Sequence, residues 1–305
     1  MTLTELKYIV AVAREAHFGR AAEACFVSQP TLSVAVKKLE EELGITLFER
    51  GKSEVRITDI GERIVEQAAR VLSESENIKQ IAFTAKDPLA GPLRLGAIYT
   101  IGPYILPSLI PNLRAMAPQM PMILQEDFTA NLRVKLRRGE LDVILIALPF
   151  EEQGVEVMPL YQEPFEALLP QDHSLCKKEL VNAEDMSKEN LLLLGEGHCF
   201  RDQVLEVCPS RQVLDSTHTK VEGTSLETLR HMVASGMGVT ILPSSALGEG
   251  QYDTNLLVAR PFCDPKPSRV VALAWRSSFP RPQAIEVVRK AILQCEPIAD
   301  LKTAS

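Results

Sequence analysis

The sequence predicts an α/β protein with an N-terminal winged helix-turn-helix, a long linker helix and two C-terminal lobes. Three observations predict these parts. The first residues carry a helix-turn-helix pattern, one amphipathic helix follows, and strands then alternate with helices to the end of the chain. A chain of 305 residues also exceeds the usual size of one domain.

Composition is that of an ordinary globular protein, with 46% hydrophobic and 24% charged residues. The formal net charge is −7, and residues 1–58 balance eight Lys and Arg against eight Glu, so net charge gives no argument for nucleic-acid binding. No apolar run reaches the roughly 18–20 residues that span a bilayer, and the N-terminus lacks a signal-peptide pattern. We therefore expect a cytoplasmic protein with no membrane partner.

The first 58 residues predict three helices and a wing. Apolar spacing indicates helices over residues 3–15 and 19–24. Ser28 can cap a third helix, which accepts Pro30 in its first turn and ends at Gly44. The buried stripe of this helix is expected to be Leu32, Ala35, Val36, Leu39 and Leu43, and its outward face Gln29, Thr31, Ser33, Lys37 and Lys38.

The outward face of the third helix has the side chains of a DNA reader. Gln29 can bond adenine through two hydrogen bonds, and the hydroxyls of Thr31 and Ser33 can contact base edges or phosphates. The stretch "TLFERGKSEVRIT" predicts two short strands of a wing, whose basic side chains can meet phosphates: Arg50, Lys52 and Arg56. The alternative is a plain helical domain with a solvated charged face.

A long helix is expected from residue 58 or 59 to about residue 85. Small or apolar residues repeat along it every three or four positions: Ile60, Ile64, Ala68, Val71, Leu72, Ser75, Ile78 and Ala82. A helix with one apolar stripe requires a partner, and a second copy of the chain suits a reader of two half-sites. Packing of the stripe on the chain's own C-terminal lobes is the alternative.

Strands and helices alternate from residue 92 onward. Continuous apolar runs such as "LDVILIAL" predict buried, mostly parallel strands. Ligands of such sheets lie beyond the carboxyl ends of the strands. Thr100, Thr129 and the segment 195–199 each follow a predicted strand, so we expect them to converge on one cleft.

Six cysteines are present, without the C-x-x-C pairs or Cys/His clusters that bind zinc, so we expect no metal and no cofactor. In a cytoplasmic protein a disulfide is more often a sensor than a structural bridge. Four cysteines are expected to be small buried apolar residues: Cys25, Cys176, Cys263 and Cys295. Cys199 and Cys208 differ, because they lie nine positions apart in the polar and apolar stretch "GEGHCFRDQVLEVCPS".

These segments together resemble a LysR-type transcriptional regulator over nearly the whole chain. The resemblance is carried by "HFGRAAEACFVSQPTLSVAVKKLEEELGITLFER", "TDIGERIVEQA", "ELDVILIAL" and "MVASGMGVTILP". It implies a winged helix-turn-helix DNA-binding domain (1–58), a linker and dimerisation helix (59–89), and an effector domain similar to a periplasmic binding protein (90–305). Lobe I of the effector domain would be residues 90–161 and 268–305, and lobe II residues 162–267.

The same resemblance implies partners rather than an enzymatic activity. These are double-stranded DNA, RNA polymerase and further copies of the chain, as a homodimer or a dimer of dimers. The DNA-contacting residues would be Ser28, Gln29, Pro30, Thr31, Ser33 and Lys37, with Arg50 at the wing.

Within the family, "TIGPYILPSLIP" and "GEGHCFRDQVLEVC" are similar to the members that sense hydrogen peroxide. By this similarity hydrogen peroxide oxidises Cys199, the peroxidatic cysteine, to a sulfenic acid, and Cys208, the resolving cysteine, forms a disulfide with it. Refolding of residues 199–208 would then alter DNA binding and transcription of oxidative-stress genes. The residues expected to support the peroxide site are Thr100, Thr129, His198, Arg201 and Asp202.

The residues around Cys199 agree with this chemistry. Only a thiolate attacks peroxide, and a free cysteine is mostly protonated at neutral pH. Cys199 opens a predicted helix, whose N-terminus favours an anion, and Arg201 adds positive charge. Asp202 can hold Arg201 or pass a proton to the leaving hydroxide, and the hydroxyls of Thr100 and Thr129 can hold the two peroxide oxygens.

The spacing of the two cysteines suits a switch. If residues 199–208 form one helix, their Cα atoms lie about 13.5 Å apart at a rise of about 1.5 Å per residue. A disulfide requires about 7 Å or less, so the helix must unwind before the bond can form. Oxidation would then exchange a helix for a loop and change the contacts between copies of the chain.

Three other functions fit parts of the sequence. A LysR-type regulator could bind a small metabolite between its lobes, with the cysteines incidental. A thiol peroxidase would use Cys199 but would leave the DNA-reader pattern unexplained. A periplasmic solute-binding protein would match the two lobes, but the missing signal peptide and the N-terminal reader argue against it.

Overall fold

The computed structural model describes residues 1–50, 55–84, 87–209, 222–248 and 255–296, together with residues 298 and 301. The chain divides into two units: Met1–Ala85 with Arg137–Glu140, and Lys86–Leu136 with Leu141–Ser305. Among the described residues, no helix combines the length and the apolar character needed to cross a membrane.

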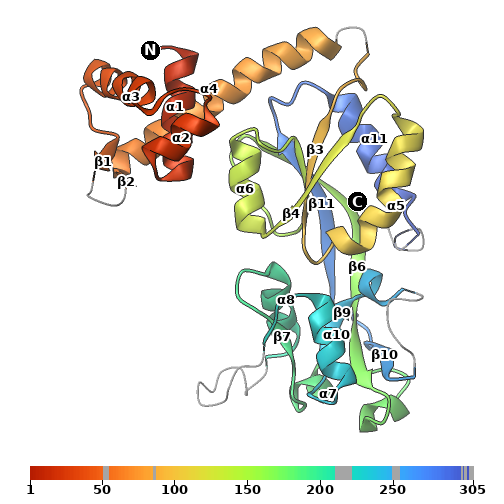
Figure 1. Ribbon diagram of the computed structural model, residues 1–305. Coiled ribbons are helices and arrows are strands. Elements are labelled where there is room, and N and C mark those ends of the chain that lie inside the picture. The colour runs from red at the N-terminus through yellow and green to blue at the C-terminus, as the bar shows by residue number, and fades with distance from the viewer. Residues whose placement is uncertain are drawn as a thin grey trace. The chain divides into compact units, whose positions relative to one another are not determined.

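The first unit is a winged helix-turn-helix followed by a long helix (Figure 1). Its elements are α1 (Leu3–Glu15), α2 (Phe18–Ala24), α3 (Gln29–Leu43), β1 (Phe48–Arg50), β2 (Val55–Ile57) and α4 (Asp59–Thr84). The first three helices pack around a core that includes Ile9, Val12 and Leu32. Strands β1 and β2 pair antiparallel, which forms the predicted wing.

Helix α3 has the predicted caps. The Ser28 hydroxyl accepts a hydrogen bond from the backbone N–H of Thr31 at 3.3 Å, and Gly44 ends the helix in the left-handed conformation, at φ 69°. The stripe residues Leu32, Val36 and Leu39 are fully buried, and Ala35 is half-buried. Leu43 is 36% exposed, because it lies in the last turn, where α3 leaves the core, so the prediction of its burial is wrong.

The apolar residues of α4 do not form one uniform stripe. Val65 and Ala68 belong to the core of the first unit, with Ile64 packed against it. Val71 and Ile78, farther along the helix, are 39% and 69% exposed. The helix therefore uses part of its apolar surface within its own unit, and a second copy of the chain as its partner stays a prediction.

The second unit alternates strands and helices along the chain. Its first half contains β3 (Leu93–Ile98), α5 (Gly102–Met116), β4 (Met122–Asp127), α6 (Thr129–Arg137), β5 (Val143–Ala147) and β6 (Val155–Pro170). Its second half contains η1 (Ser174–Lys177), α7 (Ala183–Ser187), β7 (Leu193–Leu194), α8 (Cys199–Val207), β8 (Glu222–Gly223), α10 (Leu226–Ala234), β9 (Thr240–Pro243), η2 (Ser244–Leu247), β10 (Leu257–Pro261), β11 (Ser268–Arg276) and α11 (Pro282–Leu293).

In the described part of this unit, seven strands form a mixed sheet in the order β10-β6-β11-β5-β3-β4, with β9 also paired to β6. The pairs β3–β4 and β3–β5 are parallel, whereas the pairs that β6 and β11 make with each other and with β5, β9 and β10 are antiparallel. The prediction of mostly parallel strands is therefore wrong. A run such as β5 is apolar throughout because both of its faces are buried, and this holds for either strand direction.

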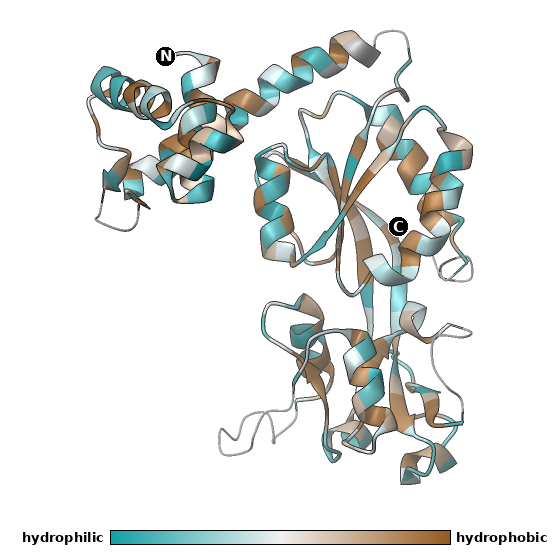
Figure 2. Cartoon of the chain, in the orientation of Figure 1, coloured by the Kyte–Doolittle hydropathy of each residue, from teal (hydrophilic) through white to brown (hydrophobic). Residues whose placement is uncertain are grey.

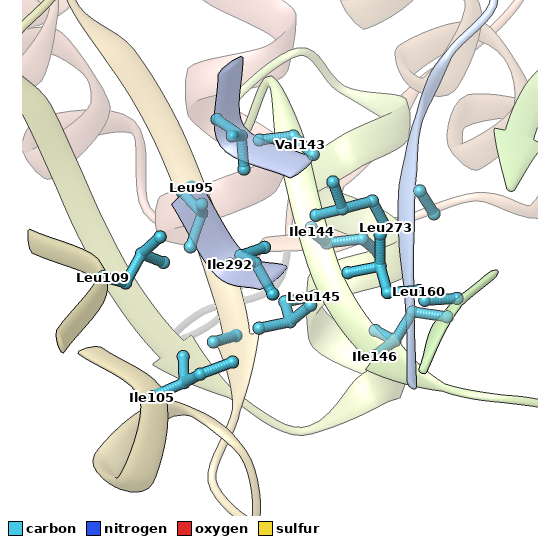
Figure 3. Packing of buried hydrophobic residues seen from close by; sticks show 14 of the residues in the cluster. Leu95, Ile105, Leu109, Val143, Ile144, Leu145, Ile146, Leu160, Leu273 and Ile292 are labelled. Atoms are coloured by element: carbon cyan, nitrogen blue, oxygen red, sulfur yellow. The ribbon is translucent and has the colours of Figure 1, made fainter. Parts of the chain in front are cut away.

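The described residues of the second unit form two hydrophobic cores, one for each lobe. The first includes Leu95, Leu145 and Ile292, which point toward one another in Figure 3. The second includes Phe165 and Phe200. Strands β6 and β11 run from one lobe into the other (Figure 1). In Figure 2 the strands of the sheet are mainly hydrophobic, whereas helix α6 is mainly hydrophilic.

A buried ion pair joins β6 to β11. The Arg269 Nε atom donates to the Glu163 Oε2 atom at 2.6 Å, and both side chains are 0% exposed. Glu163 lies between Tyr161, which belongs to the first core, and Phe165, which belongs to the second. The pair therefore sits where β6 passes from one lobe to the other.

Replacement of Glu163 by Ala should destabilise the second unit by about 3–5 kcal/mol, because it leaves the buried Arg269 charge without an opposite charge. Urea unfolding followed by the fluorescence of Trp275, the single tryptophan, measures this effect. The control is Glu179→Ala, which removes an exposed carboxylate of the same unit. Equal unfolding midpoints for the two variants would contradict the expected cost.

Candidate functional site

A small pocket opens at the start of α8. Its lining residues are Ile98, Tyr99, Thr100, Asp127, Phe128, Thr129, Gly197, His198 and Cys199. The volume is ≈10 Å³, about the space that one water-sized molecule needs. The pocket brings Thr100, Thr129, His198 and Cys199 together, as the strand ends predicted, whereas Arg201 and Asp202 do not line it.

Cys199 is the first residue of α8 and is a half-buried free thiol. It packs against the first core, while Phe200 and Val204 of the same helix belong to the second. Its place at the start of α8 puts it beside the N–H groups that have no acceptor within the helix.

Thr100 and Thr129 present hydroxyls to the pocket from the ends of β3 and β4. The Thr100 Oγ1 atom accepts a hydrogen bond from Arg269 Nη1 at 2.9 Å, which leaves the hydroxyl proton of Thr100 available for another acceptor. The Thr129 Oγ1 atom is buried and makes no hydrogen bond within the described part of the chain. A buried hydroxyl without a hydrogen-bond partner is unfavourable, and a small polar ligand in the pocket would supply that partner.

Arg269 donates two hydrogen bonds to Thr100. Its Nη2 atom donates to the Thr100 carbonyl at 2.8 Å, in addition to the bond to the Thr100 hydroxyl. Its guanidinium carbon also lies 5.2 Å from the centre of the Phe200 ring. One side chain on β11 thereby positions both the pocket hydroxyl and a core residue of α8.

His198 lies in the pocket wall as a neutral imidazole. Burial lowers its pKa, and only a hydrogen bond with the Thr224 backbone opposes this shift. Its ring makes an edge contact with the Phe128 ring and lies tilted against the Tyr99 ring. A neutral imidazole beside a thiol can accept the thiol proton.

Arg201 does not have the surroundings predicted for it. Its Nη1 atom donates to the Leu194 carbonyl at 2.5 Å and to the Glu222 carboxylate at 2.8 Å. Glu222, and not Asp202, is therefore the carboxylate that pairs with Arg201, and Asp202 is exposed to solvent. Sequence reasoning missed this because Glu222 is 21 positions away, on β8.

Cys208 lies at the other end of α8 in a different environment. It caps the helix, is 0% exposed and belongs to the second core. Its thiol donates a weak hydrogen bond to the Ala183 carbonyl at 3.6 Å, and burial raises its pKa to about 11. Because residues Cys199–Val207 form one continuous helix, the Cα atoms of Cys199 and Cys208 are about 13.5 Å apart at the usual rise per residue.

The expectation for the other four cysteines is only partly correct. All six thiols of the chain are free. Cys295 is buried, Cys25 and Cys176 are half-buried, and Cys263 is exposed. Cys263 follows the last residues of β10, where the chain leaves the sheet, so the prediction of its burial is wrong.

A second candidate surface is the outward face of α3. Gln29, Pro30, Thr31 and Lys37 are exposed on it, and Ser33 is half-buried. The Lys37 ammonium lies 3.7 Å from the Glu41 carboxylate, a solvent-exposed contact that gives little stability. This face has no evident role in folding, and its N-terminal half carries amide and hydroxyl groups.

The wing is joined directly to α3. The Glu40 Oε1 atom accepts hydrogen bonds from the backbone N–H groups of Leu47 and Phe48 at 2.7 and 3.1 Å. This explains one acidic residue at the end of α3, which the sequence alone leaves as a solvated charge. The side chain of Arg50 and all of Lys52 lie outside the described residues.

Two residues of the pocket's support were not predicted. Arg269 and Glu163 each flank an apolar run in the sequence, where a charge is usually solvated. Their partnership joins positions 106 residues apart, so no local pattern signals it. The available signal was weak: a charged residue at the edge of a strand that is otherwise buried.

The chain matches two family profiles along most of its length. Residues 3–62 match "Bacterial regulatory helix-turn-helix protein, lysR family", and residues 86–295 match "LysR substrate binding domain". It is 41% identical over 280 residues, 92% of this chain and 91% of the relative, to the "Hydrogen peroxide-inducible genes activator" of Dickeya chrysanthemi.

Two solved structures are similar over nearly the full length. One is a full-length OxyR from Pseudomonas aeruginosa, solved as a cysteine-to-aspartate variant, with 56% identity and a TM-score of 0.83, covering 100% of this chain and 99% of that one. The other is an H₂O₂-bound, cysteine-substituted OxyR from Corynebacterium glutamicum, with 32% identity and a TM-score of 0.67, covering 98% of this chain and 94% of that one.

Alkylation of the reduced protein by iodoacetamide at pH 8 should label Cys263 in the folded chain and Cys208 only after unfolding. Cys263 is exposed, whereas a pKa of about 11 leaves only about one Cys208 thiol in a thousand ionised at this pH, inside a core. Peptide mass spectrometry with and without urea measures the order. Labelling of Cys208 as fast as Cys263 in the folded chain would contradict the described position of Cys208.

Proposed function

Because the chain belongs to the LysR family of bacterial helix-turn-helix regulators, we propose that it is a DNA-binding transcription regulator that senses hydrogen peroxide through Cys199. The observation that carries the proposal is the pocket at the N-terminus of α8, where a half-buried thiol meets two threonine hydroxyls, one of them without a partner. The names of the relatives, a peroxide-inducible activator and an H₂O₂-bound regulator, support it.

In the first step the Cys199 thiolate attacks one oxygen of hydrogen peroxide and the O–O bond breaks. The attacked oxygen stays on sulfur as a sulfenic acid, and the other leaves as water after it takes up the thiol proton, which neutral His198 can carry. The Thr100 and Thr129 hydroxyls bind the two oxygens during the attack.

A metabolite would need a cavity of roughly 300 Å³ or more, far larger than the pocket at Cys199.

In the second step the Cys208 thiol attacks the sulfenic sulfur. An S–S bond forms, and the sulfenic oxygen leaves as water. The step requires α8 to unwind, because its length holds the two sulfur-bearing residues about 13.5 Å apart and a disulfide tolerates about 7 Å. Unwinding moves Phe200 and Val204 out of the second core, and this repacking is the proposed signal.

The DNA-binding face is the outward side of α3, entering the major groove with its N-terminal residues. Gln29 would read a base edge, while Ser33 and Lys37 would contact a base edge or a phosphate. Ser28, Pro30 and Thr31 would contact DNA from the first turn of the helix, which the hydrogen bond of 2.8 Å between the Ser28 and Thr31 hydroxyls holds in place. We place a second copy of the chain along α4. Residues 1–58 would then bind DNA, residues 59–89 would form the linker, and residues 90–305 would sense peroxide.

Stoichiometric hydrogen peroxide should convert Cys199 and Cys208 of the reduced full chain to a disulfide within seconds. Blocking of free thiols, proteolysis and mass spectrometry identify the cross-linked peptide. Cys199→Ser should abolish the cross-link, and Cys208→Ser should stop at the sulfenic acid. Cys263→Ser is the matched control and should leave the cross-link unchanged, because this thiol lies outside both cores.

Two thiols that remain free while the protein still binds DNA would overturn the peroxide sensor and leave the regulator. A cross-link that forms but leaves the DNA footprint unchanged would overturn the proposed signal, since repacking of α8 would then have no effect on the reader.

Lys37→Ala should weaken DNA binding almost equally for all sequences and lower the slope of log K against log salt by about one, because it removes one phosphate contact. Gln29→Ala should cost about 1–3 kcal/mol on the preferred sequence alone. Fluorescence anisotropy measures both, with a duplex that the wild-type chain selects from a random pool and a scrambled duplex. Lys188→Ala, an exposed lysine of the second unit, is the control. Equal salt slopes for Lys37→Ala and wild type would contradict the phosphate contact.

A further inference from the structure

Two aromatic side chains line the Cys199 pocket without a part in the chemistry described above. The ring centres of Tyr99 and Phe128 are 5.3 Å apart, with the rings at 77° to each other. Phe128 lies 4.8 Å from the His198 ring, and Tyr99 lies 6.1 Å from it. The three rings therefore form one cluster in the wall of the pocket, with Phe128 in edge contact with each of the other two rings.

This cluster is separate from the hydrophobic cores. Tyr99 is 37% exposed, and neither it nor Phe128 belongs to a core cluster of the described residues. The exposure of Tyr99 places the cluster at the solvent side of the pocket rather than beneath it. Folding alone gives no reason for two large rings at this place.

The loop before Cys199 is shaped to lie against the Phe128 ring. Gly197 has φ +94°, a conformation that other residues rarely adopt, and a Cβ atom there would lie 3.3 Å from the ring. Glycine thus allows the backbone to approach Phe128 closely. The approach narrows the pocket, whose volume of ≈10 Å³ leaves room for little more than one water-sized molecule.

We propose that Tyr99 and Phe128, packed with His198, form an aromatic rim that makes Cys199 selective for hydrogen peroxide over bulkier hydroperoxides. The inference rests on the proposed function, because it concerns the same thiol. Hydrogen peroxide is two oxygens with their protons, only one heavy atom larger than the water-sized molecule for which the pocket has room. An alkyl hydroperoxide such as tert-butyl hydroperoxide adds a branched carbon group that must occupy the space of a ring.

The discrimination is steric, since the bond changes are the same for both oxidants. The Cys199 thiolate takes the terminal oxygen of R–O–OH, the O–O bond breaks, and the RO⁻ group leaves and takes up a proton as ROH. The alkyl group changes the size of the leaving part and not the bond that breaks. Removal of a ring should therefore speed the reaction with the bulky oxidant more than the reaction with hydrogen peroxide.

The test compares rate constants for loss of the Cys199 thiol with hydrogen peroxide and with tert-butyl hydroperoxide, in the full chain, by rapid alkylation and mass spectrometry. Phe128→Ala and Tyr99→Ala should each raise the rate ratio of the bulky to the small oxidant by about tenfold or more. Phe128→Tyr and Tyr99→Phe keep a ring and should keep the wild-type ratio. Phe26→Ala, which removes a ring exposed in the first unit, is the matched control.

An unchanged ratio in both alanine variants would overturn the rim, as would an equal rise in the ring-keeping variants, which would indicate a general loosening of the pocket. Failure of the proposed function gives a different result, because the wild-type Cys199 would then not react with hydrogen peroxide at all. The two failures are therefore distinguished by the wild-type rate alone.

Discussion

The buried Arg269 guanidinium is the interaction on which the site depends. It pairs with Glu163, donates to both the hydroxyl and the carbonyl of Thr100, and lies over the Phe200 ring. These partners come from β6, from the end of β3 and from α8, so one side chain fixes elements of both lobes relative to β11. A buried ion pair is a weak argument for stability, because desolvation offsets most of the attraction, but its directional bonds specify one geometry. The position of the Thr100 hydroxyl in the pocket follows from those bonds.

Helix α8 connects this pocket with the second core. Its first residue packs on the first core, and Phe200, Val204 and Cys208 pack in the second. In the proposed mechanism, formation of the disulfide exposes Phe200 and Val204 to water, which costs about 1.5–3 kcal/mol for each side chain. Closing so short a loop removes about 2–3 kcal/mol of chain entropy from the unfolded segment. Both quantities oppose the disulfide, so the free energy for unwinding α8 must come from the reduction of peroxide, and Phe200 links the state of α8 to Arg269.

The elements with strong local signals could be predicted from the sequence. Ser28, Pro30 and Gly44 defined α3 to the residue, and the strand ends placed Thr100, Thr129 and Cys199 in one pocket. Features that depend on distant pairing could not. Apolar runs report burial and not strand direction, so the antiparallel course of β6 and β11 was missed. Glu222 was missed as the partner of Arg201 for the same reason, because nothing near it in the sequence marks the contact.

The central claim is that oxidation of Cys199 unwinds α8, and amide hydrogen exchange measures this most directly. The full chain is compared in its reduced form and after peroxide treatment, with peptides covering residues 199–208 and, as an internal reference, the α11 helix. The account predicts that amides of α8 exchange slowly in the reduced chain and lose their protection once Cys199 and Cys208 are joined, while α11 stays protected. Equal protection of α8 in the two states, with the disulfide present, would contradict it.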